Sequence, residues 1–536
     1  MAELILYRGS KRITITPTSA TCYLYSMGSG TVEGGEFFSL NDGYRLNALA
    51  EEIRDDYSRW IYSLNDLFLT AGLKTGDLSL FFLTDLSCKR SEFFETFDFV
   101  CSLLLIREKL LGVKLTSARL IGVESGLTRA FHSLFPATII TTKDDTPAQV
   151  RAWRRLGSDI RFLARAAGVL VINAVMKKNV VSHQNAVRTF FSIYPQMFSI
   201  AGVDTKYGSF VDKKDNYVVS ILTDGMHQKM SIVDYVRWCR EAESKGFGVI
   251  DRHLAVSDLA FGFYWASRLW WFFFQQRDQG YFFKDMDISG LIRTELLFSI
   301  SRVMRLCVVM GALRRFLEIN PVRELVYYPC EYPLGRMISW VAKSSDPSLL
   351  RTGFQMGIAS RRRLEQFLAP GEGELNPPFL KHAPIPDRIL AEDEAAASIY
   401  RYAGYQNVEV MDTIYRYLYL EQLNPQKRLG WELIAPGLHD GAMMLAQLTG
   451  EITAHPNNTY LIKPHPRADN SYLARWSMMD NLKVSTQPIA ELLAVVSHVF
   501  VTYSSVGVEA KRLGVAVTVI NVPGRVNTSP LLDCPG

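Results

Sequence analysis

Cysteine is sparse in this chain, and its seven cysteines are scattered without a CxxC pair or the spacing of a metal site. This pattern excludes a disulfide-stapled secreted domain and a cysteine-ligated zinc centre. No DxD-like pair follows a predicted strand either, so neither a metal ion nor a cofactor is expected. The cysteine usage favours a protein of the reducing cytoplasm.

Long hydrophobic runs and strong net charge are also missing. The longest apolar run, residues 259–274, contains Arg268 and is shorter than the roughly 18 residues that a membrane span needs. Arg8 interrupts the N-terminal apolar stretch, so no secretory signal is expected. The formal net charge of +5 slightly favours an anionic ligand or a membrane surface and speaks against a nucleic-acid partner.

The composition is that of a folded globular protein. Hydrophobic residues make up 48% of the chain and charged residues 21%, so a large core can form. A length of 536 residues is typical of two or three domains.

The most informative stretch is residues 460–522, where short apolar runs alternate with helical patterns. Runs of strand length lie at 460–462, 498–501 and 515–520, and helical patterns lie at 489–496 and 506–513. This alternation predicts βα units and a parallel sheet. Ligands of such sheets bind beyond the carboxyl ends of the strands.

Polar residues follow two of these predicted strands at the same sheet edge. The first cluster comprises Lys463, Pro464, His465, Pro466 and Arg467, and the second comprises Ser504 and Ser505. The serines precede a predicted helix, whose free N–H groups suit a phosphate. Glu509, about one turn into that helix, can accept hydrogen bonds from ribose hydroxyls. The two clusters together predict a nucleotide site, although two serines alone are also typical of a helix N-cap.

A His-Pro after one strand and a Ser-Ser after a later one resembles the nucleotide site of bacterial sialyltransferases and capsule Kdo transferases. These are GT-B glycosyltransferases that use CMP-activated ulosonic acids. The resemblance implies that His465 and Pro466 contact CMP and that Ser504 and Ser505 hold its phosphate. Polyol-phosphate transferases that use CDP-glycerol carry a similar His-Pro and Tyr-Ser-Ser, and CMP is the leaving group in both families.

A longer series of motifs extends this resemblance. The chain contains, in order, PDRILAEDEAAASIYRYAGY, VEVMDTIYRYLYL, KPHP, TYSSVGVEA and NTSPL. This order is similar to a family of surface-carbohydrate biosynthesis proteins. The likeness covers the C-terminal part of the chain, and LTDLSCKRSEFFETF at 83–97 extends it weakly into the N-terminal half.

The N-terminal half shows its own strand and helix alternation. A predicted strand at 78–85, a helix at 97–111 and a strand at 118–123 indicate a first Rossmann-like unit. Glu124 then lies at its ligand edge, as a catalytic carboxylate or as a solvated strand-end residue.

Two further acids are candidates for catalysis. Asp224 follows a predicted strand at 217–222 and precedes Gly225, which allows close approach of a ligand, although Asp-Gly is also an ordinary turn. Glu331 follows a strand at 324–328 and stands between two prolines that restrict its backbone. The resembled family also carries an acid at the place of Glu331.

These patterns predict a GT-B-like α/β fold with two Rossmann-like domains facing each other across a cleft. The acceptor-side domain is expected at 1–420, enlarged by a helical insertion at about 150–310, and the nucleotide-binding domain at 427–536. The polar stretch EQLNPQKR is the expected linker.

Two segments are candidates for contact with a membrane. Arginines alternate with apolar residues from 151 to 165, and residues 259–283 are dense in aromatics. A basic amphipathic segment can lie on an anionic bilayer, or it can pack its apolar side on the core. We expect a cytoplasmic protein that is at most peripherally attached to the inner face of the membrane.

The predicted function is transfer of an ulosonic acid, such as Kdo or sialic acid, from a CMP-activated donor to a glycan or lipid-linked acceptor in surface-polysaccharide biosynthesis. Lys463, with His465 and the serine pair, would bind the leaving phosphate. An acid or base must come from the other half, hence Glu331, Asp224 or Glu124. The alternatives are a UDP-sugar donor, a CDP-polyol phosphotransferase, and an inactive GT-B module that binds glycan or partner enzymes.

Overall fold

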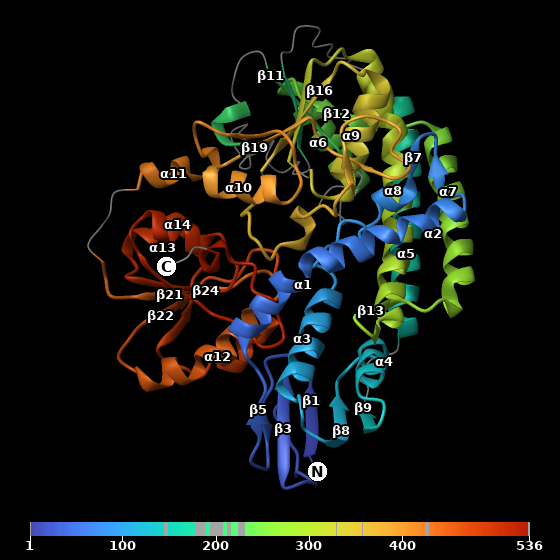
Figure 1. Ribbon diagram of the computed structural model, residues 1–536. Coiled ribbons are helices and arrows are strands. Elements are labelled where there is room, and N and C mark those ends of the chain that lie inside the picture. The colour runs from blue at the N-terminus through green and yellow to red at the C-terminus, as the bar shows by residue number, and fades with distance from the viewer. Residues whose placement is uncertain are drawn as a thin grey trace.

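The computed structural model shows an α/β protein built on parallel sheets, as the sequence predicts (Figure 1). It describes residues 2–143, 148–176, 188–192, 207–211, 216–222, 231–328, 330–355, 357–423 and 428–533. Within these ranges three large sheets carry the fold, one of five strands, one of seven and a second of five.

The first sheet has the order β5-β3-β1-β8-β9, and all its strands are parallel. Its strands are β1 (Ala2–Tyr7), β3 (Thr21–Ser26), β5 (Phe38–Ser39), β8 (Leu115–Ile121) and β9 (Ile139–Lys143). Its helices are α1 (Gly43–Ser63), α3 (Thr96–Lys109) and α4 (Ser125–Leu134). β1 pairs with both β3 and β8 and is buried along its whole length, which makes it the central strand.

The second sheet has the order β12-β11-β10-β15-β16-β19-β20 and is also parallel. Its strands are β10 (Arg188–Ser192), β11 (Asn216–Ser220), β12 (Gly248–Val249), β15 (Glu324–Tyr327), β16 (Leu350–Phe354), β19 (Arg388–Ala391) and β20 (Val408–Val410). The helices of this region are α5 (Ala148–Val175), α6 (Ile232–Ser244), α7 (Val256–Gln275), α8 (Ser289–Ile319), α9 (Pro333–Ser345) and α10 (Glu394–Tyr402).

The third sheet, of order β23-β22-β21-β24-β25, forms the C-terminal unit, drawn in orange and red in Figure 1. Its strands are β21 (Glu432–Ala435), β22 (Tyr460–Ile462), β23 (Leu482–Val484), β24 (His498–Val501) and β25 (Ala516–Val519). Its helices are α12 (Gly441–Ala454), α13 (Ile489–Val495) and α14 (Val506–Arg512). The strands and helices predicted within residues 460–522 are all present.

The N-terminal half differs from its prediction because it contains two sheets. The region expected as a helical insertion supplies helices, but it also supplies β10, β11 and β12 to the second sheet. β11 corresponds to the strand predicted at 217–222, whereas β10 and β12 were not predicted. β10 and β12 have five residues or fewer, and runs of that length cannot be told from short helix segments by periodicity. One apolar core is continuous across both sheets, from Leu4 in β1 to Val326 in β15. The domain division at about residue 420 stays a prediction.

A second difference concerns the predicted strand at 78–85. Only Leu78–Ser79 forms a strand, β7, which pairs antiparallel with β6 (Lys74–Thr75), and Leu80–Leu83 forms a 3-10 turn. All four residues of that turn are buried, so the run is apolar because it enters the core. The carboxylate of Asp85, at the end of the run, pairs with Arg90 and Arg302.

One described helix, α8, is long and apolar enough to cross a membrane. The most apolar part of it is 78% buried inside the protein, where it packs against α7 and α9. The core helix of a globular protein has the same character.

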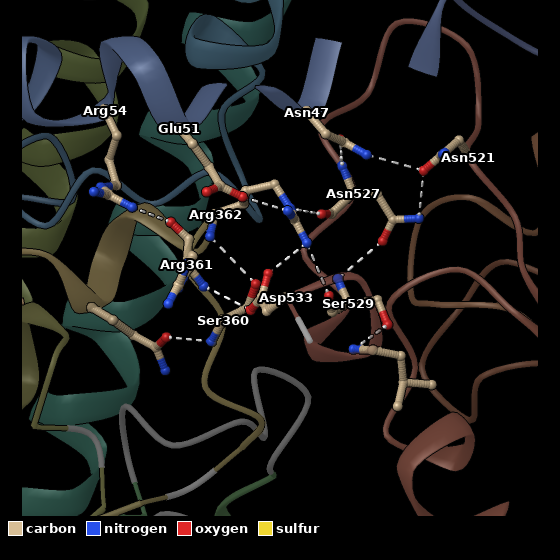
Figure 2. A network of polar contacts seen from close by, with 12 residues as sticks. Asn47, Glu51, Arg54, Ser360, Arg361, Arg362, Asn521, Asn527, Ser529 and Asp533 are labelled. Carbon is tan, nitrogen blue, oxygen red and sulfur yellow. Dashed lines mark hydrogen bonds and ion pairs between the residues drawn. The ribbon is translucent and has the colours of Figure 1, made fainter. Parts of the chain in front are cut away.

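The C-terminal segment 521–533 follows the last strand of the third sheet. It contacts α1 of the first sheet and the loop after β16 of the second sheet (Figure 2). Asn527 N–H donates to Asn47 of α1 at 2.8 Å. The guanidinium of Arg362, which follows β16, pairs with Glu51 at 2.5 Å and with Asp533 at 2.6 Å. Arg362 is buried. Through its contacts with α1 and the C-terminal segment, this junction joins elements of all three sheets at one point.

Candidate functional site

A cavity of about 220 Å3, called the first cavity below, lies at the carboxyl edge of the third sheet. The loops after four strands of that sheet line it with Gly437, Leu438, His439, Asp440, His465, Arg467, Thr502, Tyr503, Ser504, Ser505, Val522, Arg525, Val526, Asn527 and Thr528. The opposite wall comes from the N-terminal half and consists of Ser91, Glu92, Phe97, Asp98, Gly357, Ile358, Arg362, Arg363, Glu365 and Arg416. This is the sheet edge at which the sequence places a ligand.

Three of the predicted nucleotide-binding residues line this cavity together, namely His465, Ser504 and Ser505. Nδ1 of His465 accepts the N–H of Arg467 at 3.2 Å, which places the imidazole proton on Nε2. Lys463 and Pro466 do not line the cavity, and the ammonium of Lys463 donates to the Thr486 carbonyl at 3.1 Å.

Glu509 is near the cavity but does not line it. Its buried carboxylate accepts a hydrogen bond from Ser505 Oγ at 3.1 Å and another from the Tyr419 hydroxyl. In this arrangement Glu509 orients Ser505. A role toward ribose stays a prediction.

The loop between β21 and α12 forms one wall of the first cavity. Gly437 N–H donates to Thr502 Oγ1 and Leu438 N–H donates to the Tyr503 hydroxyl, each at 3.1 Å. A side chain at Gly437 would collide with the Tyr503 ring, at 2.4 Å from a β-carbon, so glycine permits this close packing. Burial raises the pKa of Asp440, which ends this loop, although Thr502 and backbone N–H groups act in the opposite direction.

His439 stands where the first cavity meets a second one. Burial is the main cause that lowers the pKa of its imidazole below 6.5, and the nearby Arg525 guanidinium acts in the same direction. The imidazole is therefore neutral near pH 7 and can accept a proton.

The second cavity, of about 420 Å3, lies at the carboxyl edge of the first sheet. Its lining consists of Arg8, Glu92, Phe93, Phe94, Glu95, Thr96, Phe99, Glu124, Leu291, Thr294, Glu295, Phe298, His439 and Arg525. Glu92, His439 and Arg525 belong to both linings, so the two cavities adjoin. Glu124 lies here, as expected of a ligand edge, and pairs with Arg8 at 3.0 Å.

The structure places Glu331 away from both linings. It is buried, and its Oε1 accepts the Tyr400 hydroxyl at 2.5 Å, while Oε2 has no hydrogen-bond partner among the described residues. Burial raises the pKa of this carboxyl. The position follows from its turn, which leads into α9 and packs beneath α10. Asp224 lies outside the described residues.

Several lining residues carried no motif in the sequence. Arg525 follows the last strand, and Arg363 follows a strand of the second sheet; only the fold brings them to one cavity. The sequence contained one sign of Glu295 that was missed. It is a lone acid among the apolar residues of the buried face of α8, which also carries Leu291 and Leu296. Among the described residues no group of three His, Cys, Asp or Glu side chains could hold a metal ion.

Neither a protein-family model nor the sequence of a curated protein matches the chain. Solved structures with similarity include a UDP-N-acetylglucosamine 2-epimerase from Rickettsia bellii, at 10% identity and a TM-score of 0.34, covering 66% of this chain and 86% of the other. The spinosyn rhamnosyltransferase SpnG complexed with thymidine diphosphate has 12% identity, a TM-score of 0.31 and coverages of 64% and 82%. The wall teichoic acid polymerase TagF has 9% identity, a TM-score of 0.29 and coverages of 70% and 79%. Similarities with TM-scores and identities this low do not indicate an activity for this chain. The proposal below is argued from the two cavities.

Proposed function

We propose that this protein is a glycosyltransferase that binds a nucleotide-activated sugar in the first cavity and transfers the sugar to an acceptor hydroxyl. One observation carries the proposal. His465, Ser504 and Ser505 line the same cavity, and residues of the N-terminal half form its opposite wall. Members of both predicted polar clusters thus line the same cavity.

The phosphate of the donor would bind between the serine hydroxyls and the His465 imidazole. The Ser504 hydroxyl and the Nε2–H of His465 are donors at the cavity wall before a ligand arrives, whereas the Ser505 hydroxyl donates its one proton to Glu509 and would have to turn to reach a phosphate. Donors fixed in advance stabilise the charge that develops on the leaving phosphate. CMP as the nucleotide, and an ulosonic acid as the sugar, are proposed on the resemblance of the KPHP and TYSSVGVEA motifs.

The acceptor would approach from the second cavity. Its hydroxyl oxygen attacks the anomeric carbon, the bond from that carbon to the phosphate oxygen breaks, and the nucleotide leaves with the bonding electrons. His439, neutral and shared by both cavities, is placed to take the hydroxyl proton. Glu124 is the other candidate, while Glu331 lines neither cavity.

A thermal-shift panel with CMP, CDP, UDP and GDP tests the nucleotide site. CMP or CDP should stabilise the protein by about 2.7 kcal/mol at a hundredfold excess over Kd, because only the folded state binds it. The double variant His465→Ala with Ser505→Ala should lose the shift. The matched control is His455→Ala with Ser477→Ala, since His455 stands in a His-Pro turn and neither side chain lines the cavity.

The outcomes separate the alternatives. A shift by UDP or GDP with none by CMP or CDP would reject the CMP-linked donor, and no shift by any nucleotide would reject the site. In a transfer assay, a product that retains the donor phosphorus would instead assign a polyol phosphotransferase. His439→Ala should slow transfer by about 10²- to 10⁴-fold if it is the base.

A further inference from the structure

The second cavity holds no part of the predicted nucleotide site, yet its walls include residues in or next to β1, α3, α4 and α8. Arg8 follows β1 and Glu124 precedes α4, so both stand at the carboxyl edge of the first sheet. Thr96, at the start of α3, and Glu295, in the second turn of α8, close the sides. A ligand here would reach His439 at the border with the first cavity.

Aromatic rings supply much of the lining. Phe94 and Phe298 meet edge to face with ring centroids 5.4 Å apart, and the Arg8 guanidinium lies over the Phe99 ring at 4.9 Å. Phe93 is more than half exposed at the cavity mouth. Flat apolar rings beside hydrogen-bonding groups suit a molecule that has both an apolar face and a polar rim.

The charges of the cavity are internally balanced. Arg8 pairs with Glu95 and Glu124, and Arg525 pairs with Glu95 and approaches Asp98 at 3.9 Å. Each guanidinium is thus already neutralised by carboxylates. A phosphate or carboxylate entering the cavity would have to displace one of them and would face the remaining acids.

Glu295 adds a buried carboxyl that pairs with no cation among the described residues. Burial raises the pKa of Glu295 to about 8, against a smaller opposing effect of the Thr96 hydrogen bond. The carboxyl is therefore protonated near pH 7 and offers one O–H donor and acceptor oxygens. A neutral group of this kind suits a ligand hydroxyl better than an ion.

We infer that the second cavity binds the acceptor as an uncharged sugar ring, stacked on the phenylalanines, with its hydroxyls bonded to the cavity carboxyls and Arg8. The inference rests on the proposed function for the identity of this ligand as the acceptor. The acceptor end is thus a neutral pyranose and not an anionic sugar, a sugar phosphate or a bare phosphate.

Saturation-transfer NMR on the full chain with CMP present tests this directly. The probes are methyl α-D-glucopyranoside and methyl α-D-galactopyranoside as neutral sugars, with glucuronic acid and glucose 6-phosphate as anionic ones. The neutral glycosides should receive saturation from the aromatic protons and the anionic sugars should not. Phe298→Ala and Glu295→Leu should each lose most of the signal. Glu295→Gln, which keeps a donor and an acceptor, should keep it, and so should Glu318→Gln, an exposed glutamate on the same helix.

Thermal melts in the same samples distinguish the possible failures. If CMP still raises the Tm but anionic sugars bind better than neutral ones, or Phe298→Ala and Glu295→Leu leave the signal unchanged, the acceptor assignment is wrong and the nucleotide site stands. If CMP gives no shift, the proposed function itself fails, and the acceptor role fails with it. Because Glu295→Gln keeps the shape of a carboxyl that is neutral in the folded protein, its melt also reports whether the variant folds.

Discussion

At the scale of single residues, the most informative side chains are acids that the fold holds in unusual environments. Glu295 and Asp98 are both buried beside the cavities, and burial raises the pKa of Glu295 to about 8 and that of Asp98 to about 7. Such groups are common at functional sites, although structural networks also produce them. Their titration is open to measurement without any knowledge of the substrate.

Glu295 should make the protein less stable as the pH rises. Its pKa is raised in the folded state, so the folded protein binds the proton more tightly than the unfolded chain, whose glutamate titrates near 4.5. The resulting stabilisation is complete below about pH 4.5 and is lost as the pH rises to about 8. Asp85 is the charged group whose proximity also raises this pKa, and Thr96 is the hydrogen-bonding partner that lowers it.

Urea unfolding at several pH values between 5 and 8.5 would check this. The difference in unfolding free energy between wild type and Glu295→Gln should grow in favour of the variant with rising pH, because glutamine cannot ionise. Asp98 contributes a slope of the same sign to both proteins and cancels in the difference. A constant difference across the range would show that the pKa of Glu295 is the same in the folded and unfolded states, and Glu318→Gln is the matched control.

At the scale of elements, the two segments expected to contact a membrane behave differently. The side of α5 that carries Phe162, Ala166 and Val169 is buried, so its apolar face packs on the protein. α7 instead presents aromatic side chains along an exposed stripe, with Phe263, Trp271 and Phe274 each more than half exposed. Peripheral attachment and cytoplasmic location remain predictions, and α7 is the element on which peripheral attachment now depends.

We expect the α7 stripe to promote binding to anionic vesicles, since aromatic rings favour the bilayer interface. Trp271→Ser with Phe274→Ser should reduce the fraction that sediments with phosphatidylglycerol vesicles. Tyr44→Ser removes an equally exposed aromatic ring from the start of α1 and should leave binding unchanged. Equal sedimentation of all three proteins, or none by the wild type, would contradict a role of the stripe.

At the scale of the whole molecule, the geometry of the first cavity depends on the junction at Arg362. This buried guanidinium pairs with Glu51 and Asp533 and donates to the carbonyl groups of Asn527 and Ser529 (Figure 2). The same residue lines the first cavity. Stability and nucleotide binding should therefore be coupled through it.

Arg362→Ala should destabilise the protein by about 3–5 kcal/mol, because it leaves the largely buried Asp533 without its cation. It should also weaken the CMP-induced thermal shift, since one cavity wall loses its support. Arg361→Ala is the control, as its side chain is exposed and only its backbone joins the junction. Calorimetry would give the energy, and a loss below about 1 kcal/mol would mean that the pair is solvated in solution.

The sequence by itself determined the parallel α/β class and the C-terminal half of the first cavity. Both are local in origin: the strands of residues 460–522 alternate with helices, and each polar cluster directly follows its strand. Parallel strands bring such clusters to one edge whatever the rest of the chain does. For this reason His465, Ser504 and Ser505 could be predicted together.

Only the tertiary structure decided which other side chains line the two cavities. Arg362, Arg525 and Glu295 are far apart in the sequence, and their positions depend on how three sheets pack and on how the C-terminal segment returns to α1. Glu331 shows the converse, because its strand and turn form as predicted, yet the packing of α10 turns its carboxyl into the core beneath Tyr400. A strand-end pattern fixes the edge at which a residue lies, whereas long-range packing fixes whether its side chain reaches a cavity.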